Sequence, residues 1–379
     1  MKIFHVIVGL NVGGAELMLR RLIEAHQEGT NYIHSVISLT TLGVVGEQLK
    51  TLGIDVRVLN MRSFLDVPRI IVQLKEIIRI DRPQIVQTWM YHADLLGGIA
   101  ARLAGNKNII WGIRTTDVQA GGTRATTLVR KVCAWLSRKV PHTIVCAADA
   151  SRRAHIAVGY DATRMTVVPN GFDLTRLVAT PEQRVGLRQL CGFDDTHVVV
   201  GTLGRFNPAK DHANFVRAAG LVAQRHPEVR FLMVGRELTS DNAVLMHWIE
   251  QTGCADRFVL LGERADVAIC LSAMDVFGLS SRTEGFPNVV GEAMAMGVPC
   301  VVTDVGDAAM LVADTGVVVP KEDSSALALG LGQLLTLDAD VLHAQGQMAR
   351  QRIVAEFTMM RARDRFEAVY QRVANESIH

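Results

Sequence analysis

Residues 274–302 read MDVFGLSSRTEGFPNVVGEAMAMGVPCVV, and this stretch decides the fold class. An apolar run at 274–279 comes before a polar loop, and a second apolar run follows at 299–302. Between them a helical pattern opens near Asn288 and ends at Gly297, since glycine commonly terminates helices and Pro299 cannot continue one. A strand, a helix and a strand in this order predict a βαβ unit of a parallel sheet.

The same alternation extends through the chain in two series. Between the apolar runs lie patterns of helical spacing, including 15–28, 68–80, 94–104 and 124–139. The sequence therefore predicts an α/β protein of two Rossmann-like, doubly wound parallel-sheet domains facing a central cleft. The expected strands are 2–9, 32–39, 54–59, 84–88, 108–113, 142–146 and 165–168 in the first series, and 197–203, 229–234, 257–261, 274–279, 299–302 and 316–319 in the second.

Domain boundaries follow from where this periodicity weakens. The stretch 176–196 is less periodic and is expected to link the domains, with one short helix at about 182–190. An N-terminal Rossmann-like domain is thus predicted over 1–175 and a C-terminal one over 197–355. The tail at 356–379 is predicted to be a helix that packs back towards the N-terminal domain, because apolar residues recur in it at helical spacing: Phe366, Val369, Tyr370 and Val373.

Composition limits the classes of function. The chain is 49% hydrophobic and 21% charged, as in a globular protein, and 5% aromatic, which argues against nucleic-acid binding through stacked bases. No Cys-x-x-Cys pair and no run of roughly 18 apolar residues occurs, so neither a zinc or redox motif of that kind nor a transmembrane helix is expected. The apolar start is short and lacks a cleavage site, so a cytoplasmic protein is predicted.

Charge is distributed unevenly although the net charge is only +2. The segment 121–153 holds seven basic residues and one acidic residue, Asp149. One interpretation is a solvated helix face, together with attraction between oppositely charged domains. The other is docking on an anionic membrane surface, at the inner face of the membrane, or on a pyrophosphate-bearing acceptor.

Gly13 and Gly14 follow the first predicted strand and open a helix. Glycine lets the backbone approach a ligand closely, and a helix start presents N–H groups to a phosphate. The spacing is not Gly-x-Gly-x-x-Gly, so the dinucleotide fingerprint is absent. The alternative is simply a tight turn between strand and helix.

Arg205 and Lys210 lie on the loop that follows the strand 197–203. Fixed cations aimed at a leaving diphosphate stabilise its developing charge without a metal ion. A surface loop with Asp211 as an ordinary helix cap is the alternative.

Glu284 and Glu292 flank the start of the helix near Asn288, in a nearly apolar segment. A carboxylate can accept two hydrogen bonds from the hydroxyl groups of a sugar, and the N–H groups at 285–289 can meet phosphate oxygens. An acid favoured by the helix dipole is the simpler explanation.

These motifs together resemble the retaining glycosyltransferases of family 4, which have the GT-B fold. The similarity rests on Gly13-Gly14-Ala15-Glu16, on Gly204 to Asp211 and on Glu284 to Ala295, in the expected order along essentially the whole chain. It implies that the C-terminal domain binds a nucleotide-sugar donor, a UDP-linked hexose or N-acetylhexosamine, and that the N-terminal domain binds a saccharide or lipid-linked acceptor. It further implies a role in cell-surface polysaccharide synthesis and no metal cofactor.

The resemblance also implies roles for single residues. Arg205 and Lys210 would hold the donor diphosphate, Glu292 the ribose and Glu284 the donor sugar. Gly14 would lie against the diphosphate from the other domain, with Gly13 beside it. The sugar and phosphate site would be lined by Gly285, Phe286, Pro287, Asn288 and Val289, and the base would lie at Gly262, Glu263 and Arg264.

His92 follows the strand 84–88 and is expected at the start of a helix. The resemblance suggests that it contacts the donor sugar or supports charge near the reaction centre. Gln87 and Trp89 stand where many relatives carry further histidines. A helix-start histidine with a satisfied hydrogen bond is the alternative.

Arg114 and Asp117 follow the strand 108–113. Arg114 could meet an acceptor phosphate and Asp117 an acceptor hydroxyl, which would make them the acceptor-binding residues. Alternatively, they form a pair that shapes a loop.

Several other hypotheses remain. A GT-B nucleotide-sugar epimerase would share the cleft and need no acceptor. A non-catalytic sugar-binding protein and a nicotinamide-dependent dehydrogenase fit the motifs less well. Asp338-Ala339-Asp340 resembles a metal-binding Asp-x-Asp, but it lies between helical segments, so a helix cap at Asp340 is expected instead.

Overall fold

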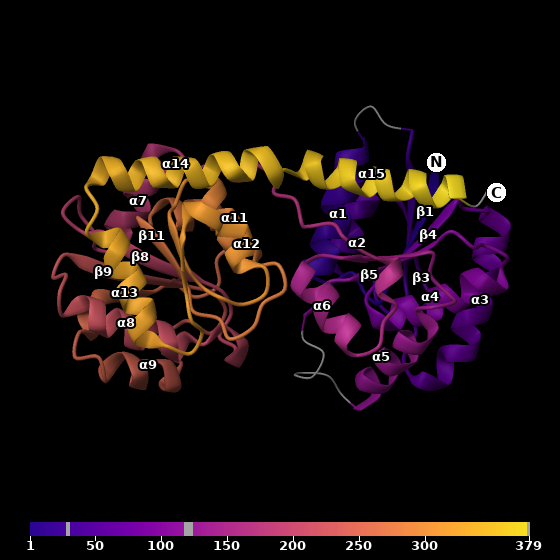
Figure 1. Ribbon diagram of the computed structural model, residues 1–379, viewed down its shortest axis with the longest axis horizontal. Helices are drawn as coiled ribbons and strands as arrows, with labels where there is room; N and C mark the ends of the chain where they lie inside the picture. Colours follow the sequence, from indigo (N-terminus) through magenta and orange to yellow (C-terminus); the bar gives the residue numbers. More distant parts are fainter. Residues whose placement is uncertain (28–30, 117–123, 377–379) are drawn as a thin grey trace. The chain divides into compact units, whose positions relative to one another are not determined.

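The computed structural model describes residues 1–27, 31–116 and 124–376, which form two compact units (Figure 1). Unit 1 consists of Met1–Gly171 and the C-terminal segment from Met359. Unit 2 consists of Phe172–Thr358. The chain therefore returns to unit 1 after completing unit 2.

Unit 1 is built on a sheet of seven strands in the order β3-β2-β1-β4-β5-β6-β7, and every neighbouring pair is parallel. Each strand lies within or close to its predicted range, so the first predicted series is confirmed. The strands are β1 (Lys2–Ile7), β2 (Ile33–Ser38), β3 (Asp55–Val58), β4 (Ile85–Trp89), β5 (Ile109–Ile113), β6 (Thr143–Cys146) and β7 (Met165–Val167).

Both faces of this sheet are covered by helices, because successive side chains of a strand point to opposite faces. In β1, Phe4 and Val6 enter the core beneath α3, α4 and α5. Ile3 and Ile7 enter the core beneath α1, α2 and α15. The long helices of unit 1 are α1 (Gly14–Gln27), α2 (Gly43–Thr51), α3 (Val67–Asp81), α4 (Tyr91–Leu103), α5 (Arg124–Leu136), α6 (Asp149–Ala157) and α15 (Met359–Glu376).

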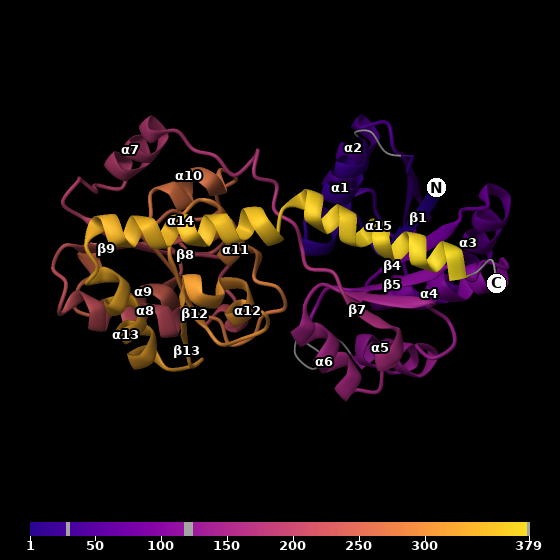
Figure 2. The same cartoon turned by 45° about the horizontal axis from the view of Figure 1, so that its top comes forward.

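The C-terminal helix α15 packs against α1 and β4 within unit 1 (Figures 1 and 2). The four apolar residues predicted at helical spacing, Phe366, Val369, Tyr370 and Val373, are all buried on it. The Tyr370 hydroxyl also donates to Gln87 Oε1 of β4 at 2.5 Å.

Unit 2 contains a sheet of six parallel strands in the order β10-β9-β8-β11-β12-β13. This arrangement confirms the second predicted series. The strands are β8 (Val198–Leu203), β9 (Val229–Val234), β10 (Phe258–Leu260), β11 (Val276–Leu279), β12 (Cys300–Thr303) and β13 (Val317–Val319).

Helices cover this sheet as well. α8 and α13 pack on one another over an apolar core of the unit, while α14 packs on α11 and α7 on α10 (Figure 2). The helices are α7 (Pro181–Leu190), α8 (His212–Ala223), α9 (Ala243–Glu250), α10 (Val267–Ser272), α11 (Asn288–Ala295), α12 (Ala308–Val312), α13 (Ser324–Leu335) and α14 (Ala339–Glu356).

The segment predicted as a link, 176–196, is attached to unit 2 by ion pairs. Arg184 Nη2 donates to Asp275 Oδ1 at 2.6 Å, and Arg188 Nη1 donates to Asp275 Oδ2 at 3.0 Å. α7, the short helix expected there, is thereby fixed beside the amino end of β11.

Two further observations concern the helices after β13. α14 is preceded by Asp338 at its N-cap, so the prediction of Asp340 as the cap is wrong by two residues, and Asp340 lies in the first turn. Among the described residues no single helix is long and apolar enough to cross a membrane. α13 and α14 meet that criterion only as a pair, which is bent by 110°.

Candidate functional site

The loops after β8 and β11 lie side by side in unit 2 because these two strands are neighbours, with Val200 opposite Val276. β8 is followed in sequence by β9 on its other side, so the strand order reverses between β8 and β11. Ligands of doubly wound sheets bind at such a reversal, beyond the carboxyl ends of the strands. The predicted donor residues Arg205, Lys210 and Glu284 all lie on these two loops.

Lys210 and Glu284 are in direct contact. Lys210 Nζ lies 2.6 Å from Glu284 Oε1, and the same oxygen accepts a hydrogen bond of 2.6 Å from Ser281 Oγ. The two side chains are 24% and 12% exposed, so the pair is partly shielded from water yet reachable by a ligand. Lys210 and Glu284 are 74 positions apart in the chain, and the fold brings them into contact.

Arg205 offers a cation that is not balanced by an acid. Its residue is exposed, and among the described residues no side chain pairs with its guanidinium. Only its main-chain oxygen is engaged, at 3.1 Å from His212 Nε2. Such a guanidinium, on the same loop as Lys210, suits an anionic ligand, because it can form a forked contact with two oxygens.

The loop after β11 leads into α11, which begins at Asn288 as predicted. Phe286 is buried and packs against the rings of Phe172 and Phe357 at centroid distances of 6.0 and 5.9 Å. Pro287 is the N-cap, and Glu292 lies one turn inside the helix and is half-buried. The aromatic packing therefore fixes the N-terminus of α11 next to Glu284.

Gly306 lies in the loop after β12 and supports the loop after β11. No sequence pattern indicated this role. Its φ of +60° lies in the left-handed region, and an added Cβ would stand 2.4 Å from the main-chain oxygen of Gly285. The neighbouring Asp307 donates its N–H to that oxygen at 2.9 Å. Only glycine permits this approach without displacing the backbone of Glu284 and Gly285.

The predicted base region follows β10. Gly262 has a φ of +64°, and its main-chain oxygen accepts from Gly235 N at 2.8 Å, which ties this loop to the one after β9. Glu263 is exposed and lies 3.4 Å from Arg236, an equally exposed side chain. Arg264 forms a hydrogen bond of 2.8 Å with Asp266, and this contact lowers the pKa of Asp266. Such exposed pairs contribute little stability, so these side chains can exchange partners for a ligand.

In unit 1 the strand order reverses between β1 and β4, whose ends carry Gly13, Gly14 and His92. Gly14 is the first residue of α1, and an added Cβ there would meet nothing within 4 Å. His92 is the second residue of α4 and is half-buried, and burial lowers the pKa of its imidazole. The predicted residues of unit 1 thus share the reversal point of their own sheet.

Met90, just before α4, has a φ of +72°, which is unusual for a residue with a large side chain. Its N–H donates to the main-chain oxygen of Gly112 at 2.8 Å, and its own oxygen accepts from Asp94 N. Backbone strain of this kind persists only where the surroundings fix it, and it is concentrated at functional sites.

Arg114 lies among aromatic side chains, and its predicted acceptor role stays a prediction. Its guanidinium lies 4.9 Å from the centre of the Trp89 ring and 5.5 Å from that of Phe366 on α15, and Nη1 donates to Asn170 at 2.8 Å. Burial lowers its pKa to about 10. Its Nε and Nη2 are buried and have no hydrogen-bond partner among the described residues. Asp117, its predicted partner, lies outside the described residues.

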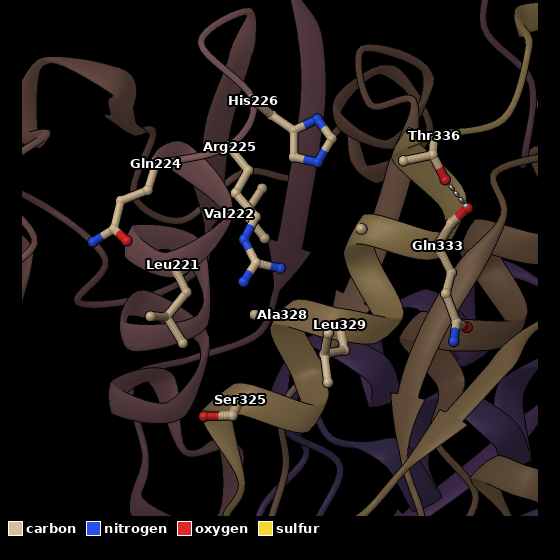
Figure 3. A pocket seen from close by; sticks show the side chains of 11 residues that line it. Leu221, Val222, Gln224, Arg225, His226, Ser325, Ala328, Leu329, Gln333 and Thr336 are labelled. Carbon is tan, nitrogen blue, oxygen red and sulfur yellow. Dashed lines mark hydrogen bonds between the residues drawn. The ribbon is translucent and has the colours of Figure 1, made fainter.

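A hollow of about 520 Å³ lies elsewhere in unit 2, between α13 and the end of α8 with the residues that follow it (Figure 3). Figure 3 shows Leu221 of α8, and Arg225 just after this helix, beside Leu329 and Ala328 of α13. Because α8 starts at the Lys210 loop and runs to the opposite edge of the sheet, the hollow is separate from the candidate site. Among the described residues no group of three or more His, Cys, Asp or Glu side chains could hold a metal ion.

Comparisons with family models and with individual proteins agree with each other. Residues 12–176 match the family model described as Glycosyltransferase Family 4, and residues 197–337 match that of Glycosyl transferases group 1. The chain is 26% identical over 306 residues to the UDP-Gal:alpha-D-GlcNAc-diphosphoundecaprenol alpha-1,3-galactosyltransferase of Escherichia coli, which covers 79% of this chain and 78% of that protein. It is 30% identical over 154 residues to the lipopolysaccharide core biosynthesis mannosyltransferase LpsB of Rhizobium meliloti, or 39% of this chain and 44% of that one.

Solved structures show the same fold. The Anabaena protein Alr3699/HepE in complex with UDP and glucose superposes with a TM-score of 0.82 at 23% identity, covering 98% of this chain and 99% of that one. The lipopolysaccharide outer core galactosyltransferase WaaB gives a TM-score of 0.71 at 17% identity, covering 97% and 99%.

Proposed function

The chain belongs to the group 1, family 4 glycosyltransferases, a retaining family with the GT-B fold, and from that premise we propose a particular reaction. It transfers a hexose or N-acetylhexosamine from a UDP-sugar to a saccharide or lipid-linked acceptor. The product is a building block of a cell-surface polysaccharide or lipopolysaccharide. The donor half of the proposal is supported by the contact of Lys210 with Glu284 at the reversal point of the sheet, on loops that also carry Arg205.

In the proposed reaction the bond between the anomeric carbon and the diphosphate breaks while the acceptor oxygen bonds to the same face of that carbon. Negative charge develops on the leaving diphosphate, and Arg205, Lys210 and the N-terminus of α11 stabilise it. The departing phosphate takes the proton of the acceptor hydroxyl. Glu284 binds the donor sugar and Glu292 the ribose.

The choice of a UDP-sugar rests on similarity. The E. coli relative uses UDP-Gal, by its name, and the Anabaena structure contains UDP and glucose. The roles predicted for Gly13, Gly14 and His92 stay predictions, since the two units are described separately.

Product analysis tests the reaction. The protein would be incubated with UDP-galactose, UDP-glucose or UDP-N-acetylglucosamine and with GlcNAc-diphosphoundecaprenol, and the linkage formed would be determined by NMR. We expect UDP release that depends on the acceptor and an α-linked product. A changed sugar nucleotide in reactions without acceptor would instead establish the epimerase alternative.

The acceptor half of the proposal includes a membrane surface, and α5 supplies the argument. Leu128 and Trp135 are 63% and 65% exposed, although apolar side chains of this size are usually buried. They lie on the same side of α5 as the exposed Lys131, and Lys139 Nζ lies 5.7 Å from the Trp135 ring. An exposed Trp and Leu among basic side chains are typical of a helix that lies on an anionic membrane.

Vesicle flotation tests this contact. We expect the protein to float with phosphatidylcholine vesicles that contain phosphatidylglycerol and not with phosphatidylcholine alone. Leu128→Ser with Trp135→Ser should abolish flotation and leave UDP binding intact. Val178→Ser, at a residue of unit 2 that is 60% exposed, is the matched control. Equal flotation of all three proteins would refute the role of α5.

A further inference from the structure

Asp211 follows Lys210 and has an unusual conformation for a residue so well buried. Its φ is +48°, in the left-handed region, and its side chain is 2% exposed. Its Oδ1 accepts the N–H of Asn214 at 3.3 Å, so it caps α8. Capping alone does not require burial, because most capping side chains are solvated at the surface.

The carboxylate of Asp211 is also engaged by Arg282, from the loop after β11. Arg282 Nε donates to Oδ2 at 2.8 Å, and Nη2 donates to Oδ1 at 3.3 Å. This forked arrangement uses both oxygens and fixes the relative orientation of the two groups. Glu322 Oε1 lies 3.3 Å from the same Nε, so the charge of Arg282, unlike that of Arg205, is already balanced.

Two more hydrogen bonds join the loop after β8, which carries Lys210, to the loop after β11. Arg282 N donates to the main-chain oxygen of Ala209 at 2.8 Å, and Ser280 Oγ donates to that of Lys210 at 2.9 Å. The contact of Lys210 with Glu284 is a further link between the two loops. The placement of both functional side chains therefore depends on the register between the two loops.

We infer that Asp211 and Arg282 are a positioning pair, which holds Lys210 and Glu284 in place for the sugar diphosphate without touching it. The inference rests on the proposed function, since it concerns how the donor is held. It adds two residues that act through their neighbours. A displacement of roughly 1 Å at a reacting group can cost about a hundredfold in rate, so such a pair has a large effect at a distance.

A double-mutant cycle on UDP binding tests the pair. The proteins are the unchanged chain, Asp211→Asn, Arg282→Gln and the double variant, with Glu322→Gln as the control that removes only the outer carboxylate. UDP affinity would be measured by calorimetry, and thermal unfolding of each protein without ligand. We expect each single variant to weaken UDP binding by about tenfold, the double variant to match the singles, and Glu322→Gln to stay within about twofold.

The control arms separate this inference from the proposed function. Lys210→Ala is measured as a further variant. If it binds UDP as tightly as the unchanged chain does, or if the unchanged chain does not bind UDP, the proposed function fails. If Lys210→Ala loses UDP binding while Asp211→Asn and Arg282→Gln retain it, only the positioning pair fails. Additive losses in the double variant would mean that Arg282 contacts the phosphate itself, and losses that follow the melting temperature would mean a contact for folding alone. Either result overturns the inference.

Discussion

The two units share one topology but carry different chemistry at the point where their strand order reverses. In unit 2 this point is charged: Lys210 and Glu284 are in contact and partly exposed, and among the described residues no side chain pairs with the guanidinium of Arg205. In unit 1 it holds glycines, the half-buried His92, whose pKa is lowered by burial, and Glu16, whose pKa is raised by burial. Two other histidines of unit 1 are fully or almost fully buried, and His5 Nε2 and His34 Nδ1 lie 2.9 Å apart.

This difference indicates that the shared topology determines where a ligand binds, whereas the residues of the loops determine which ligand can bind. A charged reversal point suits a ligand whose own charge changes during the reaction, as a leaving diphosphate does. A reversal point whose ionisable groups are shifted towards their neutral forms suits a ligand recognised by shape and hydroxyl groups.

The largest effect is expected at Lys210. Lys210→Ala removes a fixed cation from the leaving diphosphate, and turnover of the UDP-sugar should fall by about 10³-fold with an unchanged melting temperature. Arg225→Ala, which removes an exposed cation at the opposite end of α8, is the matched control and should leave turnover unchanged. If the two variants lose turnover equally, only the total positive charge of unit 2 affects the reaction, and the position of Lys210 does not.

The second prediction concerns acid stability of unit 1. Burial lowers the pKa of His26 from 6.5 to about 4 and that of His34 to about 3. The unfolded chain takes up protons near pH 6.5 while the folded state stays neutral, so stability is lost as the pH falls from about 6.5 towards 4. Between pH 7 and 4.5 we expect a loss of roughly 2–3 kcal/mol from His26 alone.

Tryptophan fluorescence measures this loss in the right unit. Trp89 and Trp111 are fully buried in unit 1, so a protein with Trp135→Phe and Trp248→Phe reports on that unit. Denaturant midpoints would be recorded across this pH range, with and without His26→Gln. The same pH dependence in both proteins would show that His26 does not contribute.

The third prediction concerns Glu292, which is proposed to bind the ribose, whereas Glu284 is proposed to bind the donor sugar. Glu292→Gln should weaken UDP binding roughly 10- to 100-fold, because a charged hydrogen bond to a ribose hydroxyl is lost. Binding of 2′,3′-dideoxy-UDP, which lacks both hydroxyls, should be the same in the variant and the unchanged chain. A loss that is equal for the two nucleotides would assign Glu292 to the phosphates or to folding.

The smallest effect is expected at Gly306. Gly306→Ala forces a Cβ against the backbone of Glu284 and Gly285, and UDP affinity should fall about tenfold with a loss of about 1–2 kcal/mol in stability. Gly332→Ala in α13, where nothing lies within 4 Å of an added Cβ, should instead be neutral or stabilise by up to about 1 kcal/mol. Calorimetry and thermal unfolding of both variants check this.

Most of the fold was predictable because its signals are local. Most strands of the two sheets fall on apolar, β-branched runs, and α11 begins at Asn288 after a polar loop. The short helix α2 was missed, since its nine residues show little apolar periodicity. α4 begins at Tyr91, three residues before the predicted start, so His92 lies inside the helix.

The sequence names candidate residues for the site but not the contacts between them. Lys210 and Glu284 were identified separately, and their pairing depends on the adjacency of β8 and β11, which no local pattern encodes. Gly306 was not identified because its neighbour is a backbone oxygen in another loop. The contact of Arg114 with Phe366 was not foreseen, because Phe366 lies some 250 positions further along the chain.

The central claim is that the loops after β8 and β11 form one site for a donor diphosphate. Calorimetric titration with UDP and with uridine, on the unchanged chain and on the Arg205→Ala, Lys210→Ala double variant, tests it most directly. We predict that the unchanged chain binds UDP far more tightly than uridine and that the double variant binds both equally weakly. A double variant that still prefers UDP to the same degree would contradict the claim.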